Sequence, residues 1–93
     1  MRDINRIDLF LEKVDFRILL RDIWKIPDME DIEILEHYVS VIVSNIDDIT
    51  EYWKDCPDLR FSQVLIATGV LPNIPGMWYY MEEDEILELQ KQE

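Results

Sequence analysis

The feature that most constrains the fold is an apolar series between two prolines, Pro27 and Pro57. Its members lie 3 or 4 residues apart, which is the spacing of one helix face and of a heptad seam. They are Ile32, Leu35, Val39, Ile42, Ile46, Ile49 and Trp53. β-Branched residues crowd before Ser44 and Asp47 follows at cap-box spacing, so both a continuous helix and a helix broken at Ser44 are compatible with the pattern.

The residues before Pro27 also favour helix. Asp3 is a candidate cap, and apolar residues keep helical spacing from Ile7 to Ile18, but the phase of this spacing shifts near Asp15. One bent helix and two shorter helices fit equally. Proline cannot continue a helix, so the segment ends at Pro27, and Pro27 or Asp28 is the predicted cap of the helix that follows.

After Pro57 the pattern changes to short elements. Asp58 is a candidate cap for a short helix that Gly69 closes. A Pro/Gly loop from Leu71 to Gly76 leads into an aromatic segment, Met77 to Met81, which is predicted to be extended. Acidic residues then favour a final helix from Glu85 to about Gln92. The predicted fold is all-α: a compact bundle of four to five helices with this loop before the last helix.

Length and composition set the class of protein. The chain has 93 residues, of which 48% are hydrophobic, so we expect one helical domain over residues 1–93. Cys56 is the only cysteine, which excludes an intramolecular disulfide and favours a cytoplasmic location. No secretory segment and no apolar run of membrane-spanning length is evident, so no membrane association is expected.

Charge is distributed unevenly along the chain. Residues 1–26 hold six basic and five acidic residues, whereas residues 27–93 hold sixteen acidic residues and only Lys54, Arg60 and Lys91 as bases. No base lies between Lys25 and Lys54. Such a field repels nucleic acid and anionic membranes and attracts basic surfaces.

This distribution predicts a protein partner with a basic surface and no direct binding of nucleic acid. Aromatic residues on a loop are typical interface anchors, so two of them join the acids as candidate contacts. The predicted partner-binding residues are Asp28, Glu30, Asp31, Glu33, Glu36, Asp47, Asp48, Glu51, Trp78 and Tyr79. For Trp78 and Tyr80 a core role, as an aromatic plug, is the competing interpretation, and alternation would leave Tyr79 facing outward.

Several spaced motifs resemble a small family of unassigned function found in bacterial and phage genomes. Its pattern is roughly R-D-x-x-R-I, then W-x-x-x-P-D-x-R-x-x-Q, then F-Y-x-E-D-D-E-L. The matching residues are Arg2-Asp3, Arg6-Ile7, Trp53, Pro57-Asp58-Leu59-Arg60, Gln63, Tyr79-Tyr80 and Glu82-Glu83-Asp84-Glu85. The resemblance covers residues 1–14 and 50–90, and it implies a helical fold, a phage or mobile-element context and a bacterial host cytoplasm.

The chain departs from that family pattern in one segment. In the family the first helix leads directly to the tryptophan, whereas here residues 15–48 intervene. The resemblance therefore implies an acidic insertion, expected to be a helical hairpin of residues 16–26 and 29–46. It implies no functional residue, because no activity is assigned to the family.

Chemistry-bearing residues give no constellation of their own. Glu33, Glu36 and His37 have helical metal-site spacing, but there is no second histidine, so no metal site is predicted. Cys56 lacks a neighbouring base, so no nucleophilic site is predicted either. Arg6 and Arg60 are expected to pair with the acids at Asp3, Asp58 or the Glu82–Glu85 run.

The expected function is an acidic protein-binding module, such as a phage- or mobile-element-encoded inhibitor that acts on a nucleic-acid-binding surface of a host protein. No enzymatic activity and no cofactor are predicted. The alternative is a structural or regulatory homo-oligomer with no electrostatic target. Its homodimer contact would use the apolar seam at Ile32, Leu35, Val39, Ile42 and Ile46.

Overall fold

The computed structural model describes residues 4–73 and 76–92. Its α-helices are α1 (Ile4–Lys13), α2 (Phe16–Ile18), α3 (Ile32–Ser44), α4 (Ile46–Asp55), α5 (Phe61–Ala67) and α6 (Glu83–Lys91). A π-helical turn, η1 (Leu19–Ile23), continues α2, and a 3-10 turn, η2 (Met77–Tyr80), precedes α6. The described residues contain no strand, so the all-α prediction is confirmed.

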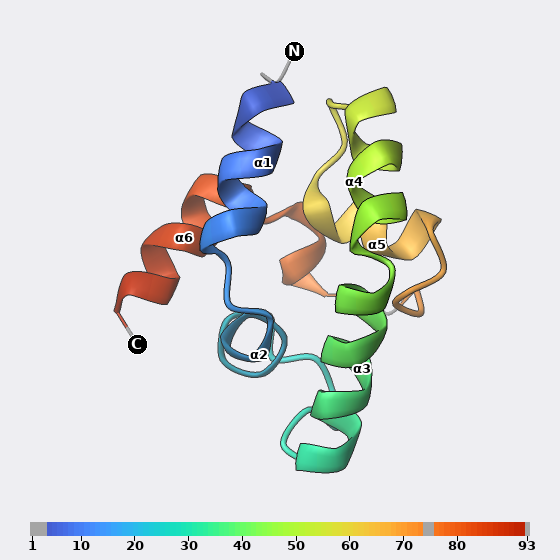
Figure 1. Cartoon of the computed structure of the whole chain (residues 1–93). Helices are drawn as coiled ribbons and strands as arrows, with labels where there is room; N and C mark the ends of the chain where they lie inside the picture. Colours follow the sequence, from blue (N-terminus) through green and yellow to red (C-terminus); the bar gives the residue numbers. More distant parts are fainter. Residues whose placement is uncertain (1–3, 74–75, 93) are drawn as a thin grey trace.

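Helix α1 lies between α6 on one side and α4 on the other (Figure 1). This helix packs against both α4 and α6, while α6 also packs against η1. Helices α3 and α4 run nearly end to end along one side of the molecule, and α2 contacts α3. Helix α5 packs against α4 and η2, which completes the bundle.

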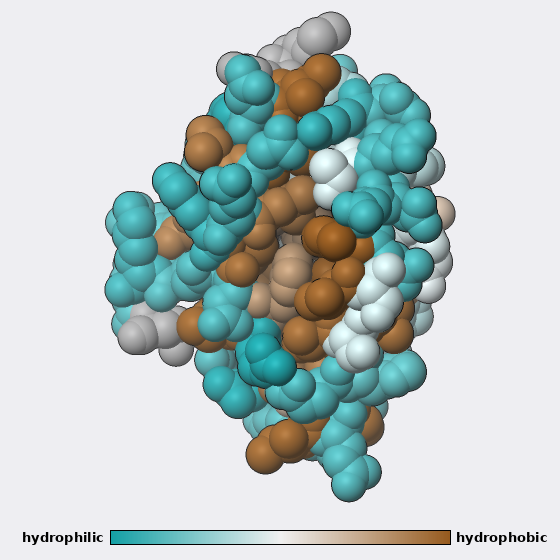
Figure 2. Space-filling view, viewed as in Figure 1, coloured by the Kyte–Doolittle hydropathy of each residue, from teal (hydrophilic) through white to brown (hydrophobic). Residues whose placement is uncertain are grey.

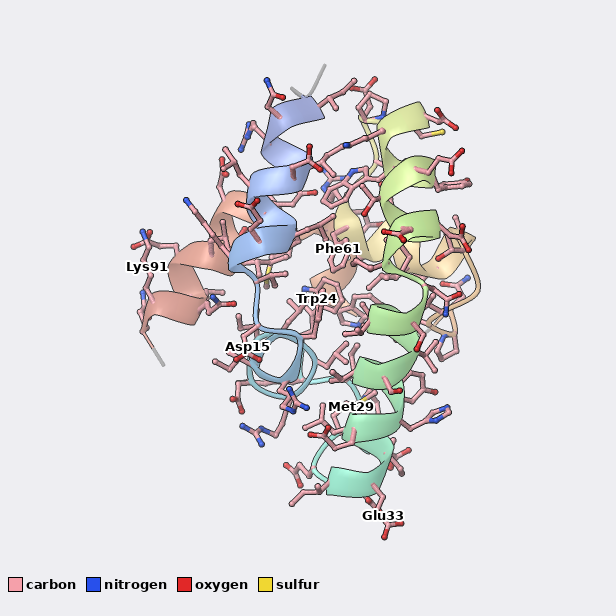
Figure 3. All side chains as sticks on the ribbon, in the orientation of Figure 1. Asp15, Trp24, Met29, Glu33, Phe61 and Lys91 are labelled. Carbon is pink, nitrogen blue, oxygen red and sulfur yellow. The ribbon has the colours of Figure 1, made fainter. Side chains whose placement is uncertain are left out.

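Phe61, the first residue of α5, is fully buried at the centre of an aromatic core (Figure 3). Its ring centroid lies 5.1 Å from that of Phe10 and 5.2 Å from that of Trp53. Phe16 and Trp24 approach the same ring at 6.2 and 6.1 Å. These aromatic residues come from five helical segments or their ends, so one ring joins α1, α2, η1, α4 and α5.

The phase shift near Asp15 is a true break between two helices. The Asp15 carboxylate accepts hydrogen bonds from the backbone N–H of Arg17 at 3.0 Å and of Ile18 at 3.3 Å, which caps α2. Gln90 of α6 secures the break from the other side: its Oε1 accepts from the Asp15 N–H, and its Nε2 donates to the Lys13 carbonyl. The reading of two shorter helices is therefore correct.

A second break separates α3 from α4 at Asn45. The Asn45 backbone N–H is bonded to carbonyls of the last turn of α3, and its side chain donates to the Val41 carbonyl at 2.8 Å. The broken-helix reading at Ser44 is thus confirmed. The second helix of the predicted hairpin, which was expected to reach Ile46, ends at Ser44.

Most residues of the apolar seam are buried within the chain itself. Leu35, Val39 and Ile42 are at most 6% exposed, and only Ile32, at 70%, faces solvent fully. Ile46 is half-buried. Three of the five residues of the predicted homodimer contact therefore already pack in the core of the same chain, while the homodimer itself stays a prediction.

The start of α3 lies later than predicted. Asp31, not Pro27 or Asp28, caps the helix, accepting from the N–H of Glu33 at 2.9 Å and of Ile34 at 3.4 Å. Residues 27–30 form turns instead, because Lys25 and Asp28 have left-handed backbones with φ of +53° and +72°. A lysine or an aspartate in the sequence does not indicate a left-handed backbone in the way that a glycine does.

Helix α5 begins at Phe61 rather than directly after Asp58. The N–H of Arg60 donates to Gln63 Oε1 at 2.9 Å, and Trp53 Nε1 donates to the Leu59 carbonyl at 2.8 Å, which keeps Leu59 outside the helix. The predicted end at Gly69 is confirmed. Gly69 has φ of +80°, and the Val70 N–H reaches back to the Leu65 carbonyl in a Schellman motif.

The aromatic segment before α6 is a 3-10 turn, so the predicted extended conformation is wrong. Trp78 is buried beside Trp24, with ring centroids 5.1 Å apart, which gives the turn a packing reason. Tyr80 is 67% exposed and does not plug the core. Helix α6 then begins at Glu83, two residues earlier than expected from the acidic run.

Candidate partner-binding surface

The predicted acidic contacts fall into two groups on the surface. Asp28, Glu30, Asp31 and Glu33 surround the start of α3, and we call them the acidic turn. Asp47, Asp48 and Glu51 lie on α4, and Glu36 lies between the groups on α3. All eight are exposed (Figure 3 shows Glu33 pointing away from the body), but the break at Asn45 divides them.

Buried residues beside the acids hold the acidic turn in place. Ile26 and Met29 are 4% and 2% exposed and belong to the core. The Met29 N–H donates to the Ile26 carbonyl at 3.3 Å, and the Asp31 N–H donates to the Asp28 carbonyl at 3.1 Å. The carboxylates therefore extend from an anchored backbone rather than from a free loop.

A groove of about 530 Å³ lies between this turn and α3. Its apolar lining comes from both sides of the turn, from one flank of α3 and from the distant loop residue Pro72. The lining residues are Ile26, Pro27, Asp28, Met29, Glu33, Ile34, His37, Tyr38 and Pro72. Sequence reasoning missed the groove because only the folded chain brings Pro72 beside α3.

The other side of the same turn has a larger depression of about 960 Å³, with a lining of mixed charge. Arg21 and Lys25 line it together with four acids, which are Asp22, Asp28, Glu30 and Asp31. Arg21 Nε lies 3.1 Å from Asp22 Oδ1, so part of this charge is compensated locally. Acidic and basic side chains are therefore mixed on this side of the turn, whereas the lining on the α3 side contains no lysine or arginine.

The acids on α4 occupy the first turns of that helix. Asp47 and Asp48 stand where a negative charge interacts favourably with the helix dipole. Within residues 4–73 and 76–92, neither they nor Glu51 form an ion pair with a basic side chain. These carboxylates remain available to a partner.

Glu36 differs from the other predicted contacts because a base within the chain already engages it. Its carboxylate accepts two hydrogen bonds from the Arg17 guanidinium, at 2.5 and 2.7 Å. This hydrogen bonding lowers the pKa of Glu36 and raises the pKa of Arg17. The pair links α2 to α3, so Glu36 contributes less net charge to the surface than its neighbours.

Trp78 does not belong to the exposed surface. Its side chain is 6% exposed and packs on Trp24, so its place in the predicted contact set is corrected to a core role. The side chain of Tyr79 lies outside the described residues. Tyr80 is the aromatic side chain that this turn presents, and the Arg60 guanidinium lies 6.0 Å from its ring centroid.

An apolar hollow opens between α1 and the α3–α4 side (Figure 2). Half-buried apolar residues include Leu11 of α1, Val14 directly after α1, and Ile46 of α4. Lys54 Nζ and Asp8 Oδ1, 3.1 Å apart, tie α4 to α1, as the Arg17–Glu36 pair ties α2 to α3. Each of these two ion pairs therefore joins two helices of the same chain.

A smaller cleft of about 160 Å³ separates α1 from α6. Arg6 pairs with Asp84 across it, and Lys13 and Glu83 also line it. Arg60 Nε lies 2.8 Å from Glu82 Oε1 nearby. The expectation that Arg6 and Arg60 pair with the closing acidic run is therefore confirmed.

The residues weighed for chemistry lie apart. His37 borders the groove in the first half of α3, whereas Cys56 is exposed at the far end of α4. In the part of the chain that the structure describes, no three histidine, cysteine or carboxylate side chains are grouped to hold a metal ion. No helix among these residues is both long and apolar enough to cross a bilayer.

Comparison with known proteins finds no matching family, no similar curated protein and no similar solved structure. What the fold and surface define is a class: a small all-α protein with an anchored acidic turn.

Proposed function

We propose that the protein is an acidic protein-binding module that docks on a basic surface of another protein. The observation that carries this proposal is the state of the acids between Asp28 and Glu51. Within the described residues, six of the eight neither pair with a base nor cap a helix; only Glu36 and Asp31 do so. Unpaired carboxylates on an anchored backbone attract basic partners and steer their approach.

The biological setting that fits this proposal best is inhibition of a host protein that binds nucleic acid. A surface built for phosphates attracts ordered negative charge, and the acidic turn supplies carboxylates that could occupy it. A phage or mobile-element origin follows only from the motif resemblance. The proposed mode of action is therefore competition with nucleic acid for a shared basic groove.

The test is capture of a partner from bacterial lysate with a charge-matched pair of variants. The first variant, Asp28→Asn with Glu30→Gln and Glu33→Gln, neutralises the acidic turn but keeps the Asp31 cap. The second neutralises three exposed acids elsewhere, with the changes Glu12→Gln, Asp55→Asn and Glu85→Gln. We expect the first variant alone to lose a captured protein, and we expect added salt to weaken wild-type capture.

Equal capture by both variants, independent of salt, would contradict the electrostatic proposal. The partner should also release nucleic acid when the wild-type protein is added, which a solubilising charge would not cause. A captured protein that keeps its nucleic acid would limit the proposal to binding without inhibition.

Oligomeric state tests the alternative of a homo-oligomer without an electrostatic target. With Leu35, Val39 and Ile42 buried in the chain itself, we expect a monomer at high micromolar concentration. Sedimentation velocity would measure this directly. A concentration-dependent dimer that captures nothing from lysate would favour the alternative.

A further inference from the structure

The groove beside α3 combines an apolar floor with an acidic rim. Ile26 and Met29 form part of its lining and are anchored in the core, while Ile34 is half-buried along one wall. Its volume of about 530 Å³ falls within the range of about 300–1,000 Å³ typical of ligand sites. An apolar surface of this size, open to solvent, favours an apolar occupant.

The charged side chains of the groove restrict what that occupant can carry. Asp28 and Glu33 are the ionised residues of its lining, and none of the described lining residues is lysine or arginine. An anionic ligand would meet repulsion from these two carboxylates, and His37 is the one basic side chain among the lining residues. A second copy of this chain is disfavoured for the same reason, because its net charge is −12.

We propose that this groove receives one large apolar side chain of the partner, flanked in the partner by lysine or arginine residues that pair with Asp28 and Glu33. This inference rests on the proposed function and deepens it by naming the recognised segment. Basic residues supply attraction and orientation, while the apolar anchor supplies a desolvated contact at the centre of the interface.

The backbone around the groove is arranged before any partner arrives. Two prolines, Pro27 and Pro72, have fixed φ angles in its lining. The Asp31 cap fixes the first turn of α3, from which Glu33 and Ile34 project. A site that is already ordered loses less conformational entropy on binding, so a short segment can be recognised.

The experiment uses a displayed library of twelve-residue random peptides selected on the wild-type protein. We expect the enriched peptides to share one leucine, methionine or phenylalanine with lysine or arginine on both sides. A synthetic peptide of that consensus, labelled with fluorescein, then gives a Kd by fluorescence anisotropy. Selection of basic peptides without an apolar position would overturn the inference.

A double-mutant cycle locates the anchor. Ile34→Gln in the protein and anchor→Ser in the peptide should each weaken binding about tenfold or more, and together little more than either alone. Val43→Gln is the matched control, because Val43 is 54% exposed on the opposite flank of α3. Circular dichroism checks that each variant folds, and the peptide change tests the anchor on unaltered protein.

The outcomes separate this inference from the proposed function. If Asp28→Asn with Glu33→Gln weakens binding while the anchor→Ser peptide binds as before, the groove inference fails and the electrostatic function stands. If the anchor matters but the two carboxylates and salt do not, the inference fails in its charge requirement and the proposed function fails with it. Enrichment of no peptide would overturn the groove as a peptide site, and lysate capture then tests the function alone.

Discussion

The protein has two regions rich in aspartate and glutamate, and the carboxylates of the two regions make different contacts. In the closing run, Glu82 pairs with Arg60, Asp84 pairs with Arg6, and Glu83 is 8% exposed and accepts from the Phe61 N–H at 3.2 Å. In the acidic turn, the carboxylates of Asp28, Glu30 and Glu33 have no basic partner among the described residues. The first region joins elements of the fold, and the second has exposed carboxylates without a basic partner among the described residues.

The comparison shows that net charge alone does not locate a binding surface. Both regions look alike in composition, yet the closing run faces the start of α5 and the bases of α1, whereas the acidic turn faces solvent. What separates them is a set of three contacts that the closing run makes in the folded chain. Two are ion pairs with arginine, and the third is the hydrogen bond from the Phe61 N–H to Glu83. Substitutions in each region test this difference, and the largest effect on stability is expected in the closing run.

Glu83→Ala should have the largest effect on stability. The change leaves the buried N–H of Phe61 without this acceptor, and an unsatisfied buried donor costs about 1–3 kcal/mol. Urea unfolding would measure the loss in the free energy of unfolding. Glu85→Ala, on the exposed side of the same turn, is the control and should change stability by less than about 0.5 kcal/mol.

Glu83→Gln retains an oxygen that can accept from Phe61, so its loss should be smaller than that of Glu83→Ala. If Glu83→Ala and Glu85→Ala were equally mild, the closing run would not serve the fold. The two acidic regions would then not differ in the way proposed.

The second prediction compares two left-handed residues that end helical segments. Gly69 closes α5 with φ of +80°, and Lys25 follows η1 with φ of +53°. Only glycine adopts this conformation freely, since other residues lose about 1–2 kcal/mol there. Lys25→Gly should therefore stabilise the protein by roughly 0.5–1 kcal/mol, and Gly69→Ala should destabilise it by roughly 1 kcal/mol.

These changes are matched because neither replaces a packed side chain. A Cβ added at Gly69 meets no atom within 4 Å, so the cost of alanine there is conformational. Lys25 is exposed, so its removal leaves no cavity. Thermal unfolding of the two variants should shift Tm in opposite directions; shifts of the same sign would show that strain is not stored before the acidic turn.

The sequence predicted the parts of the fold that depend on local pattern. The seam and the end of α5 at Gly69 follow from periodicity and from glycine, whereas the pattern was compatible with both a continuous helix and a break at Ser44. The start of α5 did not follow, because the Trp53–Leu59 hydrogen bond that delays it depends on tertiary contact. The same is true of the left-handed Lys25, whose residue type carries no such signal.

The sequence predicted the acidic residues of the candidate site but not the groove beside them. The acids of the turn could be read directly, whereas the groove needs Pro72 to lie against α3, almost forty positions further along the chain from Ile34. Trp78 was assigned to the surface because loops often carry interface aromatics, yet its contact with Trp24 buries it. Long-range packing decided both.

The third prediction concerns stability after the acidic turn is neutralised. Asp28→Asn with Glu30→Gln and Glu33→Gln relieves repulsion between neighbouring carboxylates but removes a favourable charge from the first turn of α3. These effects oppose each other, so the free energy of unfolding should change by less than about 0.5 kcal/mol. Urea unfolding beside Glu83→Ala would measure it, and a larger loss would mean that the turn, too, serves the fold.

The smallest expected effect belongs to Glu36, which stands between the two regions in character: it lies among the unpaired acids but is paired with Arg17. Hydrogen bonding from Arg17 lowers the pKa of Glu36 in the folded protein. A carboxyl with a lowered folded pKa contributes stability above its unfolded pKa and loses it as the pH falls through the folded value. The stability difference between wild type and Glu36→Gln should therefore be present at pH 7 and disappear in acid, below the ordinary glutamate range.

Both side chains of this pair are about half exposed, so the difference at pH 7 should be slight and should shrink further with salt. Urea unfolding from pH 7 to pH 3, with Arg17→Met and the double variant to complete the cycle, isolates the pair from other titrating acids. A coupling that grows as the pH falls would contradict the assignment. A coupling that vanishes in acid would place Glu36 with the closing run, as a carboxylate that serves the fold, and would leave the acidic turn as the surface open to a partner.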